Sequence, residues 1–125
     1  MSVGYRLGEW TVRPHRNRIE RGDVLVHLEP KAMAVLNCLA QASGSVVTRR
    51  EIFDSVWRGA IVSDDALTQR IVELRKAFGD SPRQSKMIET IPKMGFRLIP
   101  PVIPLAAEFE AGPVITSITI LQFVK

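Results

Sequence analysis

The stretch from Ser63 to Asp80 (SDDALTQRIVELRKAFGD) constrains the fold of this chain more than any other segment. Its apolar residues recur at helical spacing and fall within about 60° of arc on a helical wheel. These residues are Leu67, Ile71, Leu74 and Phe78. Ser63 is a good N-cap residue, and Gly79 can adopt the left-handed conformation that ends a helix. The pattern predicts an amphipathic helix whose apolar side is buried in a core.

The opposite side of this predicted helix is polar, apart from one valine. It carries Asp65, Gln69, Val72, Glu73 and Lys76, with Arg70 and Arg75 on the two flanks. Polar side chains can bond to base edges in the major groove of DNA, and cations can bind phosphates. An ordinary surface helix has the same pattern, so the neighbouring segments must decide between the two interpretations.

The segments before this helix predict a small sheet followed by a helix-turn-helix. Residues 5–28 alternate apolar and polar side chains between turn signals, which is typical of an antiparallel meander of three or four strands. A helix is expected from Pro30 to Ser43. A capping box of Thr48 and Glu51 then predicts a second helix over 48–57. That helix is expected to bury Ile52, Phe53, Val56 and Trp57, and the loop 58–62 joins it to the third helix.

The segments after the third helix predict a β-hairpin, or wing. Residues 87–91 and 96–99 are extended runs, and Gly95 is expected to supply the positive φ of the turn between them. Three prolines at 100, 101 and 104 are expected to end regular structure. We therefore predict a domain over residues 1–100 and a linker over 101–113.

Residues 114–125 form a β-prone tail, of which 114–124 (VITSITILQFV) carry no charge and are too few to span a bilayer. Two arrangements would cover such a strand. It can add to an edge of its own sheet, or it can pair with the same segment of a second chain. The sequence favours the second arrangement, a homodimer, while the start of a further sensor domain remains an alternative.

The composition excludes several functional classes. The chain has 125 residues and a net charge of +4, a basic excess that suits a polyanionic partner. His15 and His27 have no ligand-spaced partners, and no glycine-rich phosphate loop or nucleophile elbow is present. We therefore expect that the protein is not an enzyme and that it binds neither a metal ion nor a cofactor. The first ten residues lack the apolar core of a signal peptide, which predicts a cytoplasmic protein.

These segments together resemble the OmpR/PhoB-type winged-helix DNA-binding domain, and in particular the CadC/ToxR-like regulators that carry this domain at the N-terminus. The resemblance covers roughly residues 4–99. Four segments carry it: 28–31 (LEPK) with Leu36 and Leu39, 47–49 (VTR) with Ile52, Val56 and Trp57, 62–78 (ending LRKAF), and 88–98 (IETIPKMGFRL). It implies an α+β fold with a four-stranded N-terminal antiparallel sheet, three helices and a C-terminal hairpin wing.

The resemblance also implies roles for individual residues. The third helix would enter the major groove and read bases with Asp65, Gln69, Glu73 and Lys76. The DNA backbone would contact Thr48, Arg70, Val72, Arg75, Thr90, Lys93 and Arg97. The loop residues Arg58, Gly59, Ala60 and Ile61 would contact RNA polymerase. Related chains often carry arginines in place of Asp65 and Glu73, so their base preference is not transferred to this chain.

The sequence therefore predicts a transcriptional regulator that binds double-stranded DNA sequence-specifically. The alternative is a winged helix that serves only as a protein-interaction module. That alternative gives no reason for the cations at Arg70, Arg75 and Lys93, which flank the third helix and occupy the wing tip.

Overall fold

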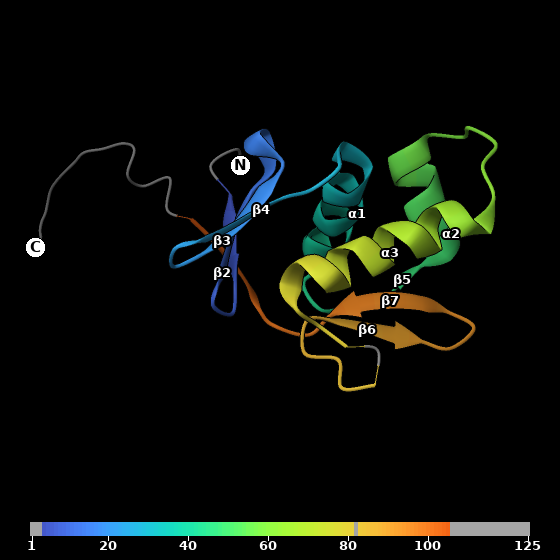
Figure 1. The fold of residues 1–125 in the computed structure, drawn as a ribbon. Coiled ribbons are helices and arrows are strands. Elements are labelled where there is room, and N and C mark those ends of the chain that lie inside the picture. Colours follow the sequence, from blue (N-terminus) through green and yellow to red (C-terminus); the bar gives the residue numbers. More distant parts are fainter. Residues whose placement is uncertain (1–3, 82, 106–125) are drawn as a thin grey trace, which may run out of the picture.

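The computed structural model describes residues 4–81 and 83–105, and it shows an α+β fold with strands at both ends and helices between them (Figure 1). The elements are β1 (Tyr5–Leu7), β2 (Trp10–Arg13), the 3₁₀ turn η1 (Pro14–Arg16), β3 (Arg18–Arg21), β4 (Val24–His27), α1 (Pro30–Gln41), β5 (Val47–Thr48), α2 (Arg49–Ile52), the π-helical segment η2 (Phe53–Trp57), α3 (Asp64–Phe78), β6 (Ile88–Ile91), β7 (Gly95–Leu98) and β8 (Val102–Pro104). With α2 and η2 counted as one helix, the predicted order of strands and helices is confirmed as far as β7.

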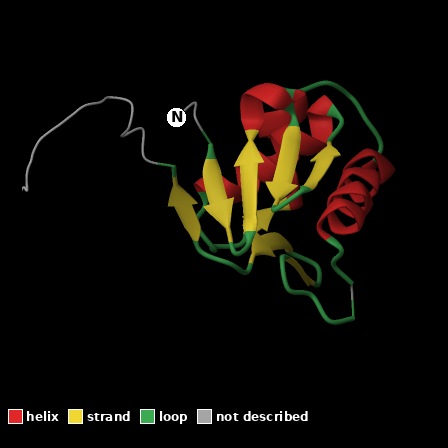
Figure 2. Cartoon of the chain, turned by 60° about the vertical axis from the view of Figure 1, so that its left-hand side comes forward, coloured by secondary structure: helices red, strands yellow, loops and turns green. Residues whose placement is uncertain are grey.

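The N-terminal sheet is antiparallel, with the strand order β4-β3-β2-β1-β8, and its strands lie side by side in front of the helices (Figure 2). Val12 lies opposite Tyr5 on one side and Ile19 on the other. Because side chains alternate across a strand, this register places Leu7, Val12 and Ile19 on the inner face, where all three are fully buried. The inner face of the sheet and the helices thus share one core.

Strand β8 corrects the prediction that regular structure ends at the prolines. Its residues pair with β1, from Tyr5 opposite Pro104 to Leu7 opposite Val102, and the N–H of Leu105 donates to the carbonyl of Gly4 at 3.0 Å. Proline is tolerated in this strand because β8 lies at the sheet edge, where a missing N–H breaks no central ladder. The sheet therefore has five strands instead of four. The rest of the expected linker, 106–113, and the tail 114–125 lie outside the described residues.

Helix α3 packs across α1 (Figure 1). The four stripe residues Leu67, Ile71, Leu74 and Phe78 are all buried, which confirms the prediction. Gly79 ends the helix at φ 71°, as expected for a left-handed C-cap. Ser63 occupies the N-cap position, but its side chain makes no capping hydrogen bond.

The second helix begins as predicted and continues differently. Its capping box is confirmed, because the N–H of Glu51 donates to Oγ1 of Thr48 at 3.1 Å and the N–H of Thr48 donates to Oε1 of Glu51 at 2.8 Å. Ile52 and Val56 are buried, whereas Phe53 and Trp57 are only half-buried and pack on each other. The expectation for these two aromatic residues was therefore wrong. Each follows a core residue by one position, about 100° around the helix, at the margin of the core.

The wing belongs to a second, three-stranded sheet with the order β5-β7-β6. The residue with positive φ in its turn is Lys93, at 65°, and not Gly95 as expected. Gly95 is needed for a different reason. A Cβ at this position would overlap the carbonyl oxygen of Val47 and lie 2.8 Å from the Cα of Thr48. The absence of a side chain lets β7 pair with β5 and fixes the wing to the start of α2.

Candidate nucleic-acid interface

The exposed side of α3 forms a continuous strip between the wing and α1. We define the reading strip as the exposed α3 residues Asp65, Thr68, Gln69, Val72 and Lys76. The strip contains three of the four predicted base-reading residues, Asp65, Gln69 and Lys76. Thr68 was missed by the sequence analysis, although it lies one helical turn before Val72 and could have been found from that spacing.

The flank of α3 that faces α1 is fastened by polar contacts. The N–H of Glu29, at the start of α1, donates to Oε2 of Glu73 at 2.8 Å. Arg70 donates from Nη1 to Oε1 of Glu29 at 2.8 Å, and its side chain is only 23% exposed. Glu73 and Arg70 therefore have partners within the protein and hold α3 against α1. Both side chains were expected to contact DNA, and these internal contacts were not predicted.

The opposite flank of α3 is fastened to the wing. Arg75 donates from Nη2 to the carbonyl of Ile88 at 3.1 Å and to Oγ1 of Thr90 at 2.8 Å. Within the wing, Nε of Arg97 donates to Oε1 of Glu89 at 2.7 Å, across the register of β6 and β7. Arg75, Thr90 and Arg97 were expected to contact the DNA backbone. The contacts of Arg75 with Ile88 and Thr90 set the position of the wing beside α3, whereas the contact of Arg97 with Glu89 joins the two strands of the wing.

The starts of α2 and α3 and the turn of the wing meet at Arg49. Its N–H donates to the carbonyl of Met94 at 3.2 Å, and its Nη2 donates to the carbonyl of Asp64 at 3.1 Å. Thr48 lies beside it, with its hydroxyl oxygen committed to the capping box. These contacts connect the start of α3, where the reading strip begins, to the turn of the wing.

Three exposed cations on α2, α3 and the turn of the wing make no ion pair with any of the described residues. They are Lys76 on α3, Lys93 at the wing tip and Arg50 on α2. Lys76 and Lys93 were predicted from the sequence. Arg50 was missed, although its place two residues after the N-cap Thr48 puts it on the first turn of the second helix.

The loop between η2 and α3 is exposed throughout. Arg58, Gly59, Ala60 and Ile61, the residues expected to contact RNA polymerase, all lie in solvent. Ile61 is fully exposed, and Arg58 holds a positive φ of 50° at the end of η2. The loop thus presents an apolar side chain on a strongly bent backbone.

The loop between α3 and β6 is organised by one carboxylate. Asp80 accepts from the N–H of Lys86 at 2.7 Å on one oxygen, and from the N–H groups of Met87 and Ile88 at 3.1 and 3.0 Å on the other. Burial alone would raise the pKa of the Asp80 carboxyl. The backbone hydrogen bonds outweigh burial and lower this pKa from its ordinary value of 3.8.

Asp80→Ala is expected to lower the free energy of unfolding by about 1–3 kcal/mol at pH 7, because it removes a charged acceptor from three N–H groups. Since the folded-state pKa is depressed, this stabilisation is present above pH 3.8 and is lost as the pH falls below that value. Urea unfolding at a series of pH values measures both effects. Asp23→Ala, at an exposed turn carboxylate, is the matched control. A deficit that grows on acidification would contradict this role of Asp80.

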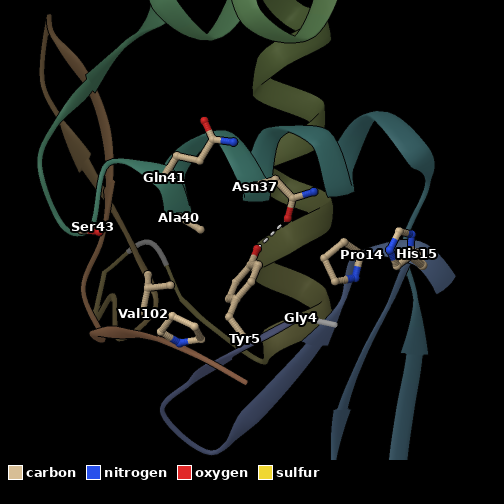
Figure 3. Close-up of a pocket in the computed structure, with 10 residues that line it drawn as sticks. Gly4, Tyr5, Pro14, His15, Asn37, Ala40, Gln41, Ser43 and Val102 are labelled. Carbon is tan, nitrogen blue, oxygen red and sulfur yellow. Dashed lines mark hydrogen bonds between the residues drawn. The ribbon is translucent and has the colours of Figure 1, made fainter. Parts of the chain in front are cut away.

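A separate pocket of about 580 Å³ lies between β1, β8 and the end of α1 (Figure 3). Inside it, the Tyr5 hydroxyl donates to Oδ1 of Asn37 at 2.8 Å, and burial raises the pKa of the Tyr5 hydroxyl. The other lining residues include Pro14, His15 and Val102. None of the lining residues comes from α3 or from the wing, so this pocket is separate from the reading strip and from the wing.

The helix-turn-helix with its exposed strip and the hairpin fastened beside it define a winged-helix domain. Residues 22–98 match the family described as "Transcriptional regulatory protein, C terminal", and the chain belongs to this family. The resemblance to OmpR/PhoB-type domains is therefore confirmed. Among residues 4–81 and 83–105, no helix has both the length and the apolar character needed to cross a membrane.

Similar proteins support the assignment to this family. The chain is 43% identical over 99 residues to the transcriptional activator CadC of Escherichia coli K12. This match covers 78% of this chain and 19% of the CadC protein. The solved DNA-binding domain of E. coli CadC has a TM-score of 0.72 at 42% identity, covering 80% of this chain and 94% of that one. The Klebsiella pneumoniae RstA DNA-binding domain, solved with the RstA box, shares the fold at 23% identity, with a TM-score of 0.65 and coverage of 74% and 93%. The chain thus spans about a fifth of the length of the full CadC protein.

Proposed function

We propose that this domain binds double-stranded DNA sequence-specifically as part of a transcriptional regulator, with α3 in the major groove and the wing on the backbone or in the minor groove. The observation that carries the proposal is the reading strip. It is exposed, while one flank of α3 makes hydrogen bonds to the start of α1 and the other makes hydrogen bonds to the wing. The major groove is wide enough to admit a helix. This chain matches 94% of the solved CadC domain, and that domain is a DNA-binding domain.

The residues of the strip suit different parts of the DNA. The amide of Gln69 can bond bidentately to adenine, and the carboxylate of Asp65 can accept from N4 of cytosine. Lys76 can bond to guanine or to a phosphate, whereas we expect Lys93 and Arg50 to bind phosphates. Thr90 and Arg97 lie on strands β6 and β7 of the wing, and we expect them to touch the DNA backbone while keeping their partners within the protein.

A second partner is proposed for the loop 58–61. Ile61 is fully exposed in this loop and adjoins Val62, which is also exposed, so the loop offers apolar side chains to a protein partner. We propose that this loop contacts RNA polymerase while α3 holds the DNA. We also propose that the domain acts in the cytoplasm of a bacterial cell, where its DNA partner lies. Homodimer formation through residues 114–124 also stays a proposal, since that segment lies outside the described residues.

Binding should weaken steeply with salt. A duplex selected from a random pool and titrated at several salt concentrations should give a slope of log affinity against log salt of about −4 to −5, because roughly four to six phosphates lose their counterions. Lys93→Ala should make the slope shallower by about one. Arg16→Ala, which removes an exposed cation from η1 in the N-terminal sheet, is the control and should leave the slope unchanged. A flat salt dependence, or no selected duplex, would leave the protein-interaction module as the better interpretation.

A further inference from the structure

Val72 is the one apolar member of the reading strip, and its side chain is 50% exposed. It is not among the residues that pack on the hydrophobic core. Valine is also a weaker helix former than alanine, because its branched side chain loses rotamer freedom in a helix. Neither burial nor helix propensity therefore explains a valine at this position.

The position of Val72 within the strip indicates its partner. It lies one helical turn after Thr68 and one turn before Lys76, with Gln69 three residues before it. The hydroxyl of Thr68 donates back to the carbonyl of Asp64 at 3.4 Å, so its proton is committed to the helix. A single exposed valine is common on protein surfaces. This one lies among the groups proposed to face the DNA bases.

A contact with phosphate, the role expected from the sequence, does not suit the chemistry of this side chain. A phosphate oxygen needs a hydrogen-bond donor or a positive charge, and valine offers neither. The major groove presents one prominent apolar group, the C5-methyl group of thymine. Cytosine carries a hydrogen in its place.

We infer that Val72 contacts the C5-methyl group of a thymine and so selects thymine at one position of the DNA site. This inference rests on the proposed function and deepens it, because it assigns one base preference to one residue. The contact would remove two apolar surfaces from water without any hydrogen bond. Val72 would then contribute to specificity and not to phosphate affinity.

The test replaces each thymine of a selected duplex, one at a time, by deoxyuridine. This exchange keeps base pairing and the groove hydrogen-bonding groups and removes only the methyl group. At one position the wild-type affinity should fall about fourfold, the effect of burying one methyl-sized group. Val72→Ala should bind the thymine duplex about fourfold more weakly and should not distinguish thymine from uracil at that position.

Two controls separate the possible failures. Val24→Ala shortens another exposed valine, in β4, and should keep the wild-type response to uracil. Thermal unfolding should show that Val72→Ala is folded. A Val72→Ala variant that keeps the full thymine–uracil difference would overturn the inference and leave DNA binding intact, as would a selected site that contains no thymine. Failure to select any duplex would overturn the proposed function itself.

Discussion

Phe78→Ala is expected to lower the free energy of unfolding by about 3–5 kcal/mol, close to the whole stability of a small domain. Phe78 ends the buried stripe of α3 and is only 4% exposed. Its ring lies edge-on to that of Trp10, with centroids 5.5 Å apart, so its loss leaves a cavity between α3 and the N-terminal sheet. Urea unfolding followed by circular dichroism measures the change.

Trp57→Ala is the matched comparison, because the sequence predicted the same burial for both aromatic residues. Trp57 is half-buried at the end of η2, so its truncation should cost about half as much as that of Phe78. Equal losses for the two variants would contradict the observed difference in burial. A Phe78→Ala variant that unfolds at nearly the urea concentration of the parent would show that the ring does not hold α3 to the sheet.

Gly95→Ala is expected to lower the free energy of unfolding by about 3 kcal/mol, the upper end of the range for overpacking. The added Cβ meets the backbone of Val47 and Thr48, which cannot rotate away as a side chain can. The pairing of β7 with β5 should open and displace the wing from the start of α2. Affinity for a selected duplex should therefore fall together with stability.

Met94→Ala is the control for this second change. Met94 precedes Gly95 in the same turn, and its side chain is exposed, so truncation should leave stability within about 0.5 kcal/mol of the parent. Urea unfolding and titration with DNA should be run on both variants. If Gly95→Ala matched Met94→Ala in both measurements, the close approach of β7 to β5 would not be what anchors the wing.

Much of the fold could be predicted because it depends on local patterns. The stripe of α3 is set by a 3.6-residue period, and the start of α2 is set by a capping box contained within four residues. Strand β8 was missed for the opposite reason. Three prolines indicate a break in regular structure, and only pairing with β1, almost a hundred residues earlier in the chain, shows that an edge strand tolerates one of them.

The site could be predicted in part. A helical wheel places Gln69 and Lys76 on the exposed side of α3, but it does not show what lies against its flanks. Glu73 bonds to the N–H of Glu29, 44 residues earlier in the chain, and this contact depends on how α3 packs on α1. The role of Gly95 could not be predicted either. A glycine in a hairpin turn usually supplies a positive φ, and only the structure shows that the backbone of β5 leaves no room for a side chain at this position.

The central claim is that α3 and the wing form the surface that binds DNA. Its most direct test is a titration of the ¹⁵N-labelled chain with a selected duplex, followed by backbone amide chemical shifts. We predict the largest shifts along residues 65–76 and 93–95, with small shifts in strands β2 to β4. Shifts confined to the N-terminal sheet, with α3 and the wing unchanged, would contradict the claim.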